Sequence, residues 1–415
     1  MDPKRLLILG GGRYNVPSIR AARQAGFVVF VADRNPDAPG LKIADYPLAI
    51  DLNDRNSLLE AVGRLGGVHG TVSMAEAGVR AAANLSARMG LPSISEEAAA
   101  NATSKAAMRR LWSKTRYSTD FKVVTTADEA QAAATKLGFP LIFKPDRSLG
   151  GSRGVTCVEN IGDVVRAYEK AKEGGLADSA VVIERRVEGT EHSAEVLIWQ
   201  KRTSVLCAGQ KIKSQFPYRV DISVQYPAPL DAAQESSVAE MCQQAVTALG
   251  LTQGVAHIEF AYTGHGPVLF ELGARCGGGH TPQIAHHVSG VDEFVEACRM
   301  ACGMAPSRFE AIARRGADYR FLVFPPGVVQ NVTVPDDLLN DSHVLDVGVT
   351  IQRGDTIRSL TTTSERAGFV VTMGETMQEA ADRADRACRQ ISIQYADGTV
   401  RQASETGEFR VLAHS

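Results

Sequence analysis

Short apolar segments that predict β-strands alternate with amphipathic segments that predict helices along the N-terminal part of the chain. Residues 6–9 and 28–32 have strand character, and residues 16–26 between them have helical character. Residues 70–73 and 78–90 repeat the pattern. Such alternation is typical of a parallel sheet with helices packed against it. We therefore expect the chain to begin with an α/β domain.

A glycine turn, Gly10-Gly11-Gly12, directly follows the first predicted strand, and Asp33 ends the second. Together they suggest a dinucleotide-binding fold. The complete fingerprint needs a third small residue where this chain has Asn15, so the match is partial. Glycine turns of this kind also occur in α/β domains that bind no dinucleotide. An NAD-dependent oxidoreductase therefore stays open as one alternative.

The pattern changes further along the chain. Residues 96–114 have helical character, and a second α/β series begins at residue 121. Strand-rich segments between residues 191 and 272 bracket one long helical segment, and the tail from about residue 318 predicts short strands and a final helix. We place a domain boundary near residue 95 and expect the tail to form a closing subdomain.

Charge and composition exclude several classes of protein. The 415 residues include 45 Lys and Arg against 47 Asp and Glu, and the two signs are intermixed, so nucleic acid is not an expected partner. No apolar run approaches the roughly 20 residues of a membrane helix, and the apolar start is too short for a signal peptide. We expect a cytoplasmic protein without a membrane partner. The seven cysteines include no CxxC pair, so neither a disulfide framework nor a zinc site is indicated.

Lys144 ends an apolar, strand-like segment, and a turn rich in glycine and serine follows it at residues 148–154. A lysine in this position can reach a phosphate while the exposed N–H groups of the turn surround the other phosphates. The turn is not a Walker A loop, because no Gly-Lys-Ser or Gly-Lys-Thr follows it. On these residues alone, a hairpin turn next to a solvated lysine also remains open.

A second polar segment begins where the predicted strand 181–184 ends. A strand that ends in a polar hinge offers main-chain donors and acceptors to the edge of an adenine. Glu191, seven positions after Glu184, is a candidate acceptor for ribose hydroxyl groups. A charged surface turn explains the same residues, so both interpretations stay open at this point.

The third signal consists of two carboxylates in otherwise apolar strands. Glu259 and Glu271 flank a hairpin-type turn at residues 263–266. Buried carboxylates are costly unless they are paired, and two of them across a hairpin can converge on one cation. Hard oxygen ligands of this kind suit Mg²⁺ that bridges ATP phosphates. Arg275, four residues past Glu271, can hold a carboxylate or an acyl phosphate with two hydrogen bonds.

The order of these signals resembles the ATP-grasp carboxylate–amine ligases over nearly the whole chain. The resemblance implies an α/β fold in which two lobes grip ATP. It places an N-terminal Rossmann-like (pre-ATP-grasp) domain at residues 1–95 and the ATP-grasp domain at residues 96–305, with a lid at about 121–187. A C-terminal α+β subdomain at residues 306–415 is expected to complete the core.

The resemblance also implies roles for individual residues. Lys105 and Lys144 match phosphate-contacting lysines, of which Lys144 is also expected to act in catalysis. Glu259 and Glu271 match the ligands of two Mg²⁺ ions, which Mn²⁺ can replace, and Arg275 matches the catalytic arginine that faces the acyl phosphate. The remaining expected ATP contacts are Ser148, Gly150, Gly151, Ser152 and Gly154 in the lid loop, Glu184, Arg185 and Val187 around adenine, and Glu191 at the ribose.

One position departs from the family pattern. Where many relatives have Glu-x-Asn-x-Arg, this chain has Gly273 in place of the asparagine. The amide oxygen that usually completes the shell of the second metal is therefore absent, which leaves open the geometry of that metal. The segments at 15–19 and 32–45 are similar to purine-pathway carboxylases and transformylases, whereas residues 271–279 and the tail are closer to L-amino acid ligases.

The resemblance implies an ADP-forming ligase that activates a carboxylate as an acyl phosphate and joins it to an amine, with an amino acid as the expected substrate. A carboxylase or purine-pathway ligase of the same fold, an NAD-dependent oxidoreductase and a nucleotide-binding protein without activity remain as alternatives. His280 is a candidate for contact with substrate, and Lys211 and Lys213 for contact with phosphate or substrate. The identities of the acid and the amine stay open, and a homodimer is expected because relatives are commonly dimers.

Overall fold

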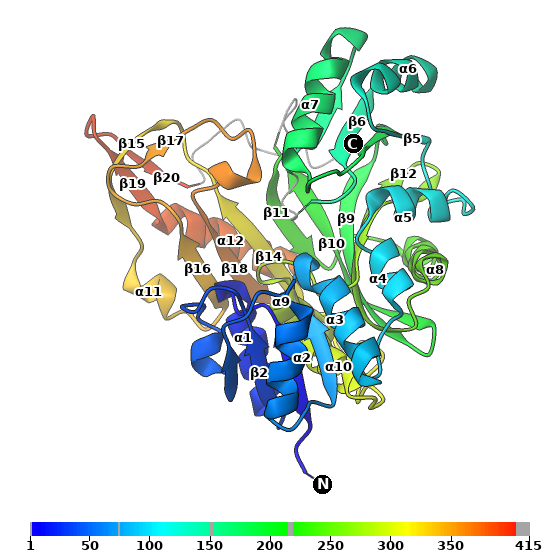
Figure 1. Cartoon of the computed structure of the whole chain (residues 1–415). Coiled ribbons are helices and arrows are strands. Elements are labelled where there is room, and N and C mark those ends of the chain that lie inside the picture. The colour runs from blue at the N-terminus through cyan, green and yellow to red at the C-terminus, as the bar shows by residue number, and fades with distance from the viewer. Residues whose placement is uncertain (1, 74, 149–152, 215–218, 404–415) are drawn as a thin grey trace.

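The computed structural model describes residues 2–73, 75–148, 153–214 and 219–403. Figure 1 shows the N-terminal elements at the bottom of the molecule, the helices α6 and α7 at the upper right, and the C-terminal strands β15, β19 and β20 at the upper left. Among the described residues, no helix has the length and apolar character needed to cross a membrane.

The N-terminal elements form a parallel sheet with strand order β3-β2-β1-β4. Its central strand is completely buried from Leu6 to Leu9, because helices cover both faces. The parallel α/β unit expected from the sequence is thereby confirmed. The elements are β1 (Arg5–Leu9), η1 (Arg13–Asn15), α1 (Val16–Gln24), β2 (Val28–Ala32), η2 (Leu41–Ile43), β3 (Tyr46–Leu48), α2 (Arg55–Arg64), β4 (Gly70–Ser73) and α3 (Glu76–Met89).

The glycine turn after β1 is closed by contacts within the N-terminal unit. Asp33 accepts a hydrogen bond from Gly11 N at 2.8 Å through one carboxylate oxygen and from Asn35 N at 2.9 Å through the other. The backbone of Gly40 lies so near Gly11 that a Cβ on Gly40 would approach Gly11 Cα to 2.7 Å. Both oxygens of the carboxylate that a dinucleotide fold would direct at a ribose are therefore engaged in holding the turn.

Two short helices lead into a small antiparallel sheet with strand order β5-β8-β6-β7. Two helices pack on this sheet around a core of their own, which includes Phe143, Val158 and Ile183. We refer to β5–β8 with α6 and α7 as the lid. The elements are α4 (Glu96–Asn101), α5 (Lys105–Trp112), β5 (Phe121–Val124), α6 (Ala127–Leu137), β6 (Leu141–Pro145), β7 (Thr156–Val158), η3 (Ile161–Asp163), α7 (Val164–Gly174) and β8 (Val181–Arg185).

An eight-stranded antiparallel sheet forms the centre of the molecule, with strand order β13-β12-β9-β10-β11-β14-β18-β16. Five of its strands precede residue 274, and the other three come from the C-terminal part of the chain. The elements in this stretch are β9 (Thr190–Trp199), β10 (Arg202–Lys213), β11 (Asp221–Tyr226), α8 (Ala232–Leu249), β12 (Gln253–Thr263), β13 (Gly266–Gly273), α9 (Thr281–Ser289), α10 (Glu293–Ala301), β14 (Gly316–Leu322), β16 (Val344–Val349) and β18 (Gly368–Gly374).

The C-terminal part adds a second small sheet with order β17-β15-β19-β20. Its elements are β15 (Gly327–Thr333), α11 (Asp336–Leu339), β17 (Thr356–Ile357), η4 (Thr363–Glu365), α12 (Met377–Gln390), β19 (Ser392–Tyr395) and β20 (Val400–Gln402). Because β14, β16 and β18 belong to the central sheet, residues after 305 complete that sheet as well as forming a lobe. The division of the chain near residues 95 and 305 remains a proposal.

The two faces of the central sheet have different chemistry where β9, β12 and β13 lie side by side. Ala194, Ile258 and Leu272 point to one face, where they join the core beneath α8. Side chains alternate between the faces of a strand, so the residues next to these in sequence point to the opposite face. That opposite face carries Glu259 and Glu271, and we call it the site face.

Candidate active site

Glu259 and Glu271 are directly opposite each other in the antiparallel register of β12 and β13. Residues paired in this way have Cβ atoms roughly 5 Å apart, so the two carboxylates share one part of the site face. Both side chains are partly accessible, at 37% and 38%. The structure therefore brings together the two residues that the sequence predicts as magnesium ligands.

Each of these carboxylates has a lysine partner. Lys105 Nζ lies 2.7 Å from Glu271 Oε1, and Lys211 Nζ lies 2.8 Å from Glu259 Oε2. Burial opposes ionisation of both glutamates, but Lys105 beside Glu271, and Lys211 with His257 beside Glu259, outweigh it and lower the pKa values of both carboxyl groups. Both glutamates are therefore anionic at neutral pH and able to accept a cation.

Lys105 begins α5, and contacts from the end of β6 determine its position. Asp146 Oδ1 accepts hydrogen bonds from Ser104 Oγ at 2.7 Å and from Ala106 N at 2.8 Å. The N–H of Lys105 itself donates to Asp146 O at 3.1 Å. Asp146 thus joins the start of α5 to the lid, a connection that we did not predict from the sequence.

Lys144 lies in a buried cluster with Glu184 and Arg109. Arg109 donates to both oxygens of Glu184, with Nε at 2.5 Å and Nη2 at 2.8 Å, and Lys144 Nζ lies 2.8 Å from Glu184 Oε1. Burial disfavours the charge of Glu184, yet the two cations together lower its pKa to about 2. For Lys144 the effect of burial exceeds that of Glu184, so the pKa of its amine is lowered. Arg109 was not singled out from the sequence.

The residues expected around adenine and ribose follow this cluster along the chain. Arg185 donates to Leu137 O at 2.7 Å, and Val187 is partly buried in the segment between β8 and β9. The carboxylate of Glu191, at the start of β9, lies 2.6 Å from Lys213 Nζ and 3.3 Å from Arg219 Nη2. Lys213 also contacts Asp221 at 2.7 Å, so a chain of alternating charges extends from β9 to β11.

The lid loop is described only at its ends. Gly150, Gly151 and Ser152 lie outside the described residues, whereas Ser148 and Gly154 lie within them. Gly154 has a φ of +73°, and a Cβ there would approach Lys170 O to 3.0 Å. The requirement for glycine at this position therefore has a local explanation, which is close packing against α7.

Arg275 contacts a residue of the N-terminal unit. Its Nε lies 3.2 Å from Oε2 of Glu76, the first residue of α3, and its Nη1 donates to Cys276 O at 2.8 Å. Burial raises the pKa of Glu76, against the opposing effect of Arg275. One signal in the sequence points to Glu76: it opens a helix shortly after the strand β4, at the carboxyl end of a parallel strand, where α/β proteins place functional residues.

Gly273 leaves room for this ion pair. A Cβ at this position would lie 3.2 Å from Arg275 Cζ and 3.3 Å from Glu76 Oε2. The missing side chain thus coincides with the place where Arg275 and Glu76 meet. This geometry gives a physical reason for the departure from the family pattern.

A histidine connects Glu259 to the interior of the protein. His257 Nδ1 lies 2.6 Å from Oε1 of the buried Glu195, and its Nε2 lies 3.5 Å from Glu259 Oε1. Burial opposes protonation of His257, but Glu195 and Glu259 together raise its pKa to about 9. His280, the other histidine considered from the sequence, is buried between aromatic rings and lies 3.1 Å from Asp346.

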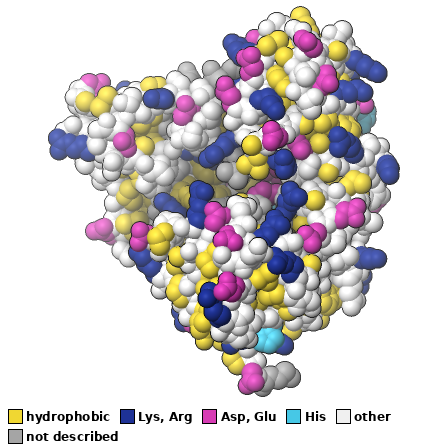
Figure 2. Space-filling view, viewed as in Figure 1, with side chains coloured by type: hydrophobic (Ala, Val, Ile, Leu, Met, Phe, Trp, Pro, Cys, Tyr) yellow, Lys and Arg dark blue, Asp and Glu magenta, His cyan; other side chains and the backbone are white. Residues whose placement is uncertain are grey.

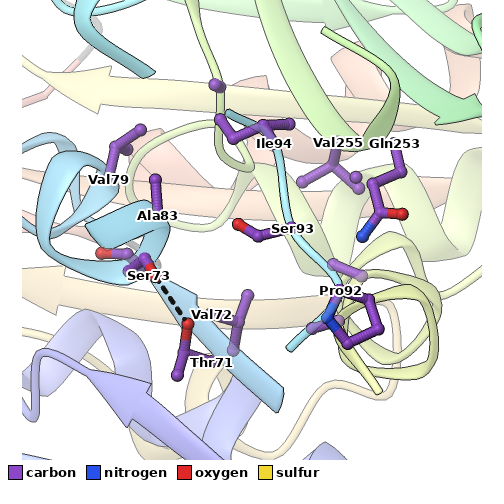
Figure 3. A pocket seen from close by; sticks show the side chains of 15 residues that line it. Thr71, Val72, Ser73, Val79, Ala83, Pro92, Ser93, Ile94, Gln253 and Val255 are labelled. Carbon is purple, nitrogen blue, oxygen red and sulfur yellow. Dashed lines mark hydrogen bonds between the residues drawn. The ribbon is translucent and has the colours of Figure 1, made fainter. Parts of the chain in front are cut away.

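The surface of the molecule is hollowed on the side drawn in Figure 2. Figure 2 shows a depression between the three lobes, with basic and acidic side chains along one wall. A separate cavity of about 70 Å³ lies between the N-terminal unit and β12, lined by small residues such as Thr71, Ser73 and Ala83 (Figure 3). Thr71 Oγ1 donates to Ala82 O and Ser73 Oγ donates to Ala75 O, so these two hydroxyl groups are paired within the protein.

The donor set suits magnesium held together with a nucleotide. Among the described residues, no group of three or more His, Cys, Asp or Glu side chains is placed to hold a metal ion by itself. Mg²⁺ in ATP-dependent enzymes is usually held by one or two carboxylates, with phosphate and water as the other ligands. Glu259 and Glu271 supply that number of carboxylates, so the residues present fit the ion.

Comparisons with known proteins identify two family matches in the chain. Residues 101–308, half of the chain, match the family described as carbamoyl-phosphate synthase L chain, ATP binding domain. Residues 320–396 match the L-amino acid ligase C-terminal domain 2.

Relatives and solved structures extend the similarity to most of the chain. An uncharacterized protein of Sinorhizobium fredii, y4rH, is 25% identical over 82% of this chain and 72% of its own length. The formate-dependent phosphoribosylglycinamide formyltransferase of a Synechococcus strain, RCC307, is 25% identical over 94% of this chain and 98% of its own. The crystal structure of L-amino acid ligase from Bacillus licheniformis has a TM-score of 0.80 at 21% identity, over 95% of this chain and 99% of that one, a likeness that concerns the fold.

The expected α/β architecture is confirmed by these matches, which cover residues 101–308 and most of the C-terminal lobe. The protein belongs to the ATP-grasp superfamily, in the family of the carbamoyl-phosphate synthase L chain ATP-binding domain.

Proposed function

We propose that this protein is an ADP-forming ligase that activates a small carboxylate as an acyl phosphate and joins it to an amine. The observation that carries the proposal is the grouping of Lys105, Glu259, Glu271 and Arg275 around one part of the site face. The match of residues 320–396 to an L-amino acid ligase domain supports an amino acid as substrate.

The proposed ATP site lies between the lid and the site face. Lys105 and Lys144 would neutralise phosphate charge, and the lid-loop residues Ser148 and Gly154, with those between them, would cover the phosphates. The hinge at Glu184–Val187 would hold adenine through its backbone, because the carboxylate of Glu184 is already bound by Arg109 and Lys144. Glu191 would accept hydrogen bonds from the ribose.

Glu259 and Glu271 would hold Mg²⁺, with two ions expected and Mn²⁺ as a substitute. When bound, the metal supplies positive charge to the phosphate oxygens during transfer. In this geometry binding would require Lys105 and Lys211 to yield part of their contact with the two glutamates. Both lysines would then be free to face the phosphate groups of the nucleotide.

The protein side chains have distinct tasks in the proposed reaction. Lys105 and Lys144 stabilise the charge that develops as the γ-phosphoryl group passes from ATP to the substrate carboxylate. Arg275, with its planar pair of donors, holds the acyl phosphate while the amine attacks the acyl carbon and phosphate leaves. A closed lid would keep water from the labile acyl phosphate.

A second candidate is a purine-pathway or bicarbonate-dependent ligase of the same fold. The similarity to a formate-dependent formyltransferase over 94% of the chain supports this alternative. An NAD-dependent oxidoreductase has less support, since both oxygens of Asp33 already accept hydrogen bonds from Gly11 and Asn35.

The decisive experiment combines the purified protein with ATP, MgCl₂ and either a mixture of amino acids, formate or bicarbonate. Phosphate release is measured, nucleotides are separated by chromatography, and products are identified by mass spectrometry. ADP and phosphate with a new amide in the amino acid mixture would support the ligase. AMP and pyrophosphate would contradict the acyl phosphate route, and turnover only with formate or bicarbonate would select the second candidate.

Gel filtration with light scattering tests the proposed homodimer.

A further inference from the structure

Glu195 is a fully buried carboxylate behind the proposed metal site. It lies in β9, where it is paired with His257 of β12, and its side chain points to the site face. Oε1 contacts His257 Nδ1 at 2.6 Å, and Oε2 accepts a hydrogen bond from Gly277 N at 3.2 Å. One carboxylate therefore holds a side chain on β12 and the backbone of the turn that follows β13.

The histidine extends this contact to the proposed metal ligand. His257 precedes Glu259 by two residues, so both side chains point to the same face of β12. Because Nδ1 is held by Glu195, the ring is oriented with Nε2 toward Glu259 Oε1, 3.5 Å away. The rotamer of Glu259 is thus limited by Lys211 on one side and by the Glu195–His257 pair on the other.

The second arm of Glu195 reaches the segment that carries Arg275. Gly277 follows Arg275 by two residues, and a Cβ at Gly277 would approach His257 Nδ1 to 2.9 Å and Thr281 Cγ2 to 2.4 Å. The turn therefore packs tightly against the histidine, and the absence of a side chain permits its N–H to reach Glu195. The backbone that positions Arg275 is tied to the same carboxylate as Glu259.

A buried ion pair by itself adds little to the stability of a fold. Replacing a buried ionic pair with apolar residues of similar volume is often neutral or stabilising. Groups that orient the direct ligands of a metal, by contrast, change metal affinity or activity roughly 10- to 100-fold when they are lost. Both arms of Glu195 end next to residues of the proposed site, which fits the second pattern.

We propose that Glu195 is a positioning residue that aligns the metal carboxylate Glu259 through His257 and the arginine segment through Gly277. The inference rests on the proposed ligase function, because it takes Glu259 as a metal ligand and Arg275 as the group that faces the acyl phosphate. It goes beyond that function by assigning one buried residue to the alignment of both parts of the site.

The first test is Glu195→Gln, which keeps the shape of the side chain but leaves only one acceptor oxygen for two donors. We expect the dissociation constant of Mn²⁺ in the presence of ADP, measured by electron paramagnetic resonance, to rise roughly 10- to 100-fold. We also expect kcat for phosphate release in the amino acid mixture to fall, with a smaller change in KM for ATP. The Mn²⁺ measurement needs no turnover, so it reads the site even if the ligase reaction itself is disproved.

The second test is His257→Asn, whose amide can still donate to Glu195 but does not extend to Glu259. It should weaken Mn²⁺ binding as Glu195→Gln does. If the two residues act in one chain, the double variant should be no weaker than the poorer single variant, because coupled positions are not additive. Additive losses would contradict the proposed route through His257. This variant also decides the matter if Glu195→Gln does not fold.

Asp318→Asn is the matched control. Asp318 is also fully buried in the central sheet, but it accepts hydrogen bonds from Ser223 and Gln225 on the opposite face. The Asp318→Asn substitution should lower the unfolding temperature and leave the Mn²⁺ dissociation constant unchanged. The proposal is overturned if Glu195→Gln behaves like this control, with lost stability, Mn²⁺ affinity within twofold of the wild type and unchanged kcat. An inactive wild-type protein would instead overturn the ligase function.

Discussion

Arg275 and Glu76 form an ion pair between two parts of the chain that are separated by 199 positions. The arginine follows β13, the strand that contains Glu271, whereas the glutamate begins α3 in the N-terminal unit. The pair places a residue of the N-terminal unit beside the proposed catalytic arginine. The N-terminal unit thus contributes directly to the candidate site.

Arg275→Lys should separate chemistry from nucleotide binding. The lysine keeps the positive charge but loses the planar pair of donors. We expect KM for ATP to stay within about threefold and amide formation to fall by roughly 10²-fold, the size found when a preorganised donor is removed. Steady-state kinetics and product analysis check this. A large rise in the dissociation constant of ATP with normal chemistry would mark Arg275 as a nucleotide ligand.

Lys144→Ala should weaken ATP binding and lower turnover by roughly 10²-fold, because a buried amine near the proposed position of the phosphates is lost. Isothermal titration with ATP and the phosphate assay measure the two effects. Lys122→Ala, on the lid strand β5, which β8 separates from the strand of Lys144, is the control and should change neither. Unchanged binding and turnover in Lys144→Ala would disprove the assignment.

Gly273→Asn tests why the family pattern is broken at this position. A Cβ here would lie 3.2 Å from Arg275 Cζ, so the larger side chain should displace the Arg275–Glu76 pair. We expect activity to fall at every Mg²⁺ concentration, and Gly273→Ala, which adds only the Cβ, to retain more of it. A magnesium titration of ATP hydrolysis provides the measurement. Activity regained at lower Mg²⁺ in the asparagine variant would show instead that the missing amide limits metal binding.

The buried cluster at Glu184 should make the protein sensitive to acid. Arg109 and Lys144 lower the pKa of Glu184 to about 2 from an ordinary value of 4.5. A carboxylate with a lowered pKa stabilises the fold above its unfolded pKa, and this stabilisation is lost as pH falls from about 4.5 to 2. The contribution is of the order of 3 kcal/mol. Urea unfolding at several pH values should show a smaller acid dependence in Glu184→Gln, and an equal dependence would contradict the assignment.

The strands that carry the site are well predicted from the sequence, because each is a short apolar segment interrupted by a few polar residues. Lys144, Glu259 and Glu271 stand out for this reason. The hairpin turn sets a register, with Thr263 opposite Gly266, that would place Glu259 opposite Phe270. A β-bulge between Glu259 and Phe260 shifts the pairing and brings Glu271 opposite Glu259, so the turn alone does not predict that the two carboxylates face each other. The ATP-grasp fold was confirmed, while the individual roles of these residues stay predictions.

The partners of these residues were less predictable. Arg109 lies 75 positions from Glu184, and nothing in its helix distinguishes it from the adjacent Arg110 before the helix is packed. Glu195 likewise stands in a strand with several other polar residues, and only the register with His257 reveals its partner. Contacts of this kind depend on tertiary packing, which a local pattern does not contain.

The order of the central sheet has a consequence for engineering. Strand β11, near the middle of the sheet, is paired with β10 on one side and with β14 from the C-terminal part on the other. Cutting the chain after residue 305 would leave the main-chain N–H and C=O groups of β11 without β14, and an exposed edge of this kind invites aggregation. Exchange of the C-terminal part between relatives is therefore not a transfer of an autonomous module. A chimera must instead preserve the pairing of β11 with β14, so hybrids should be designed around that strand pair.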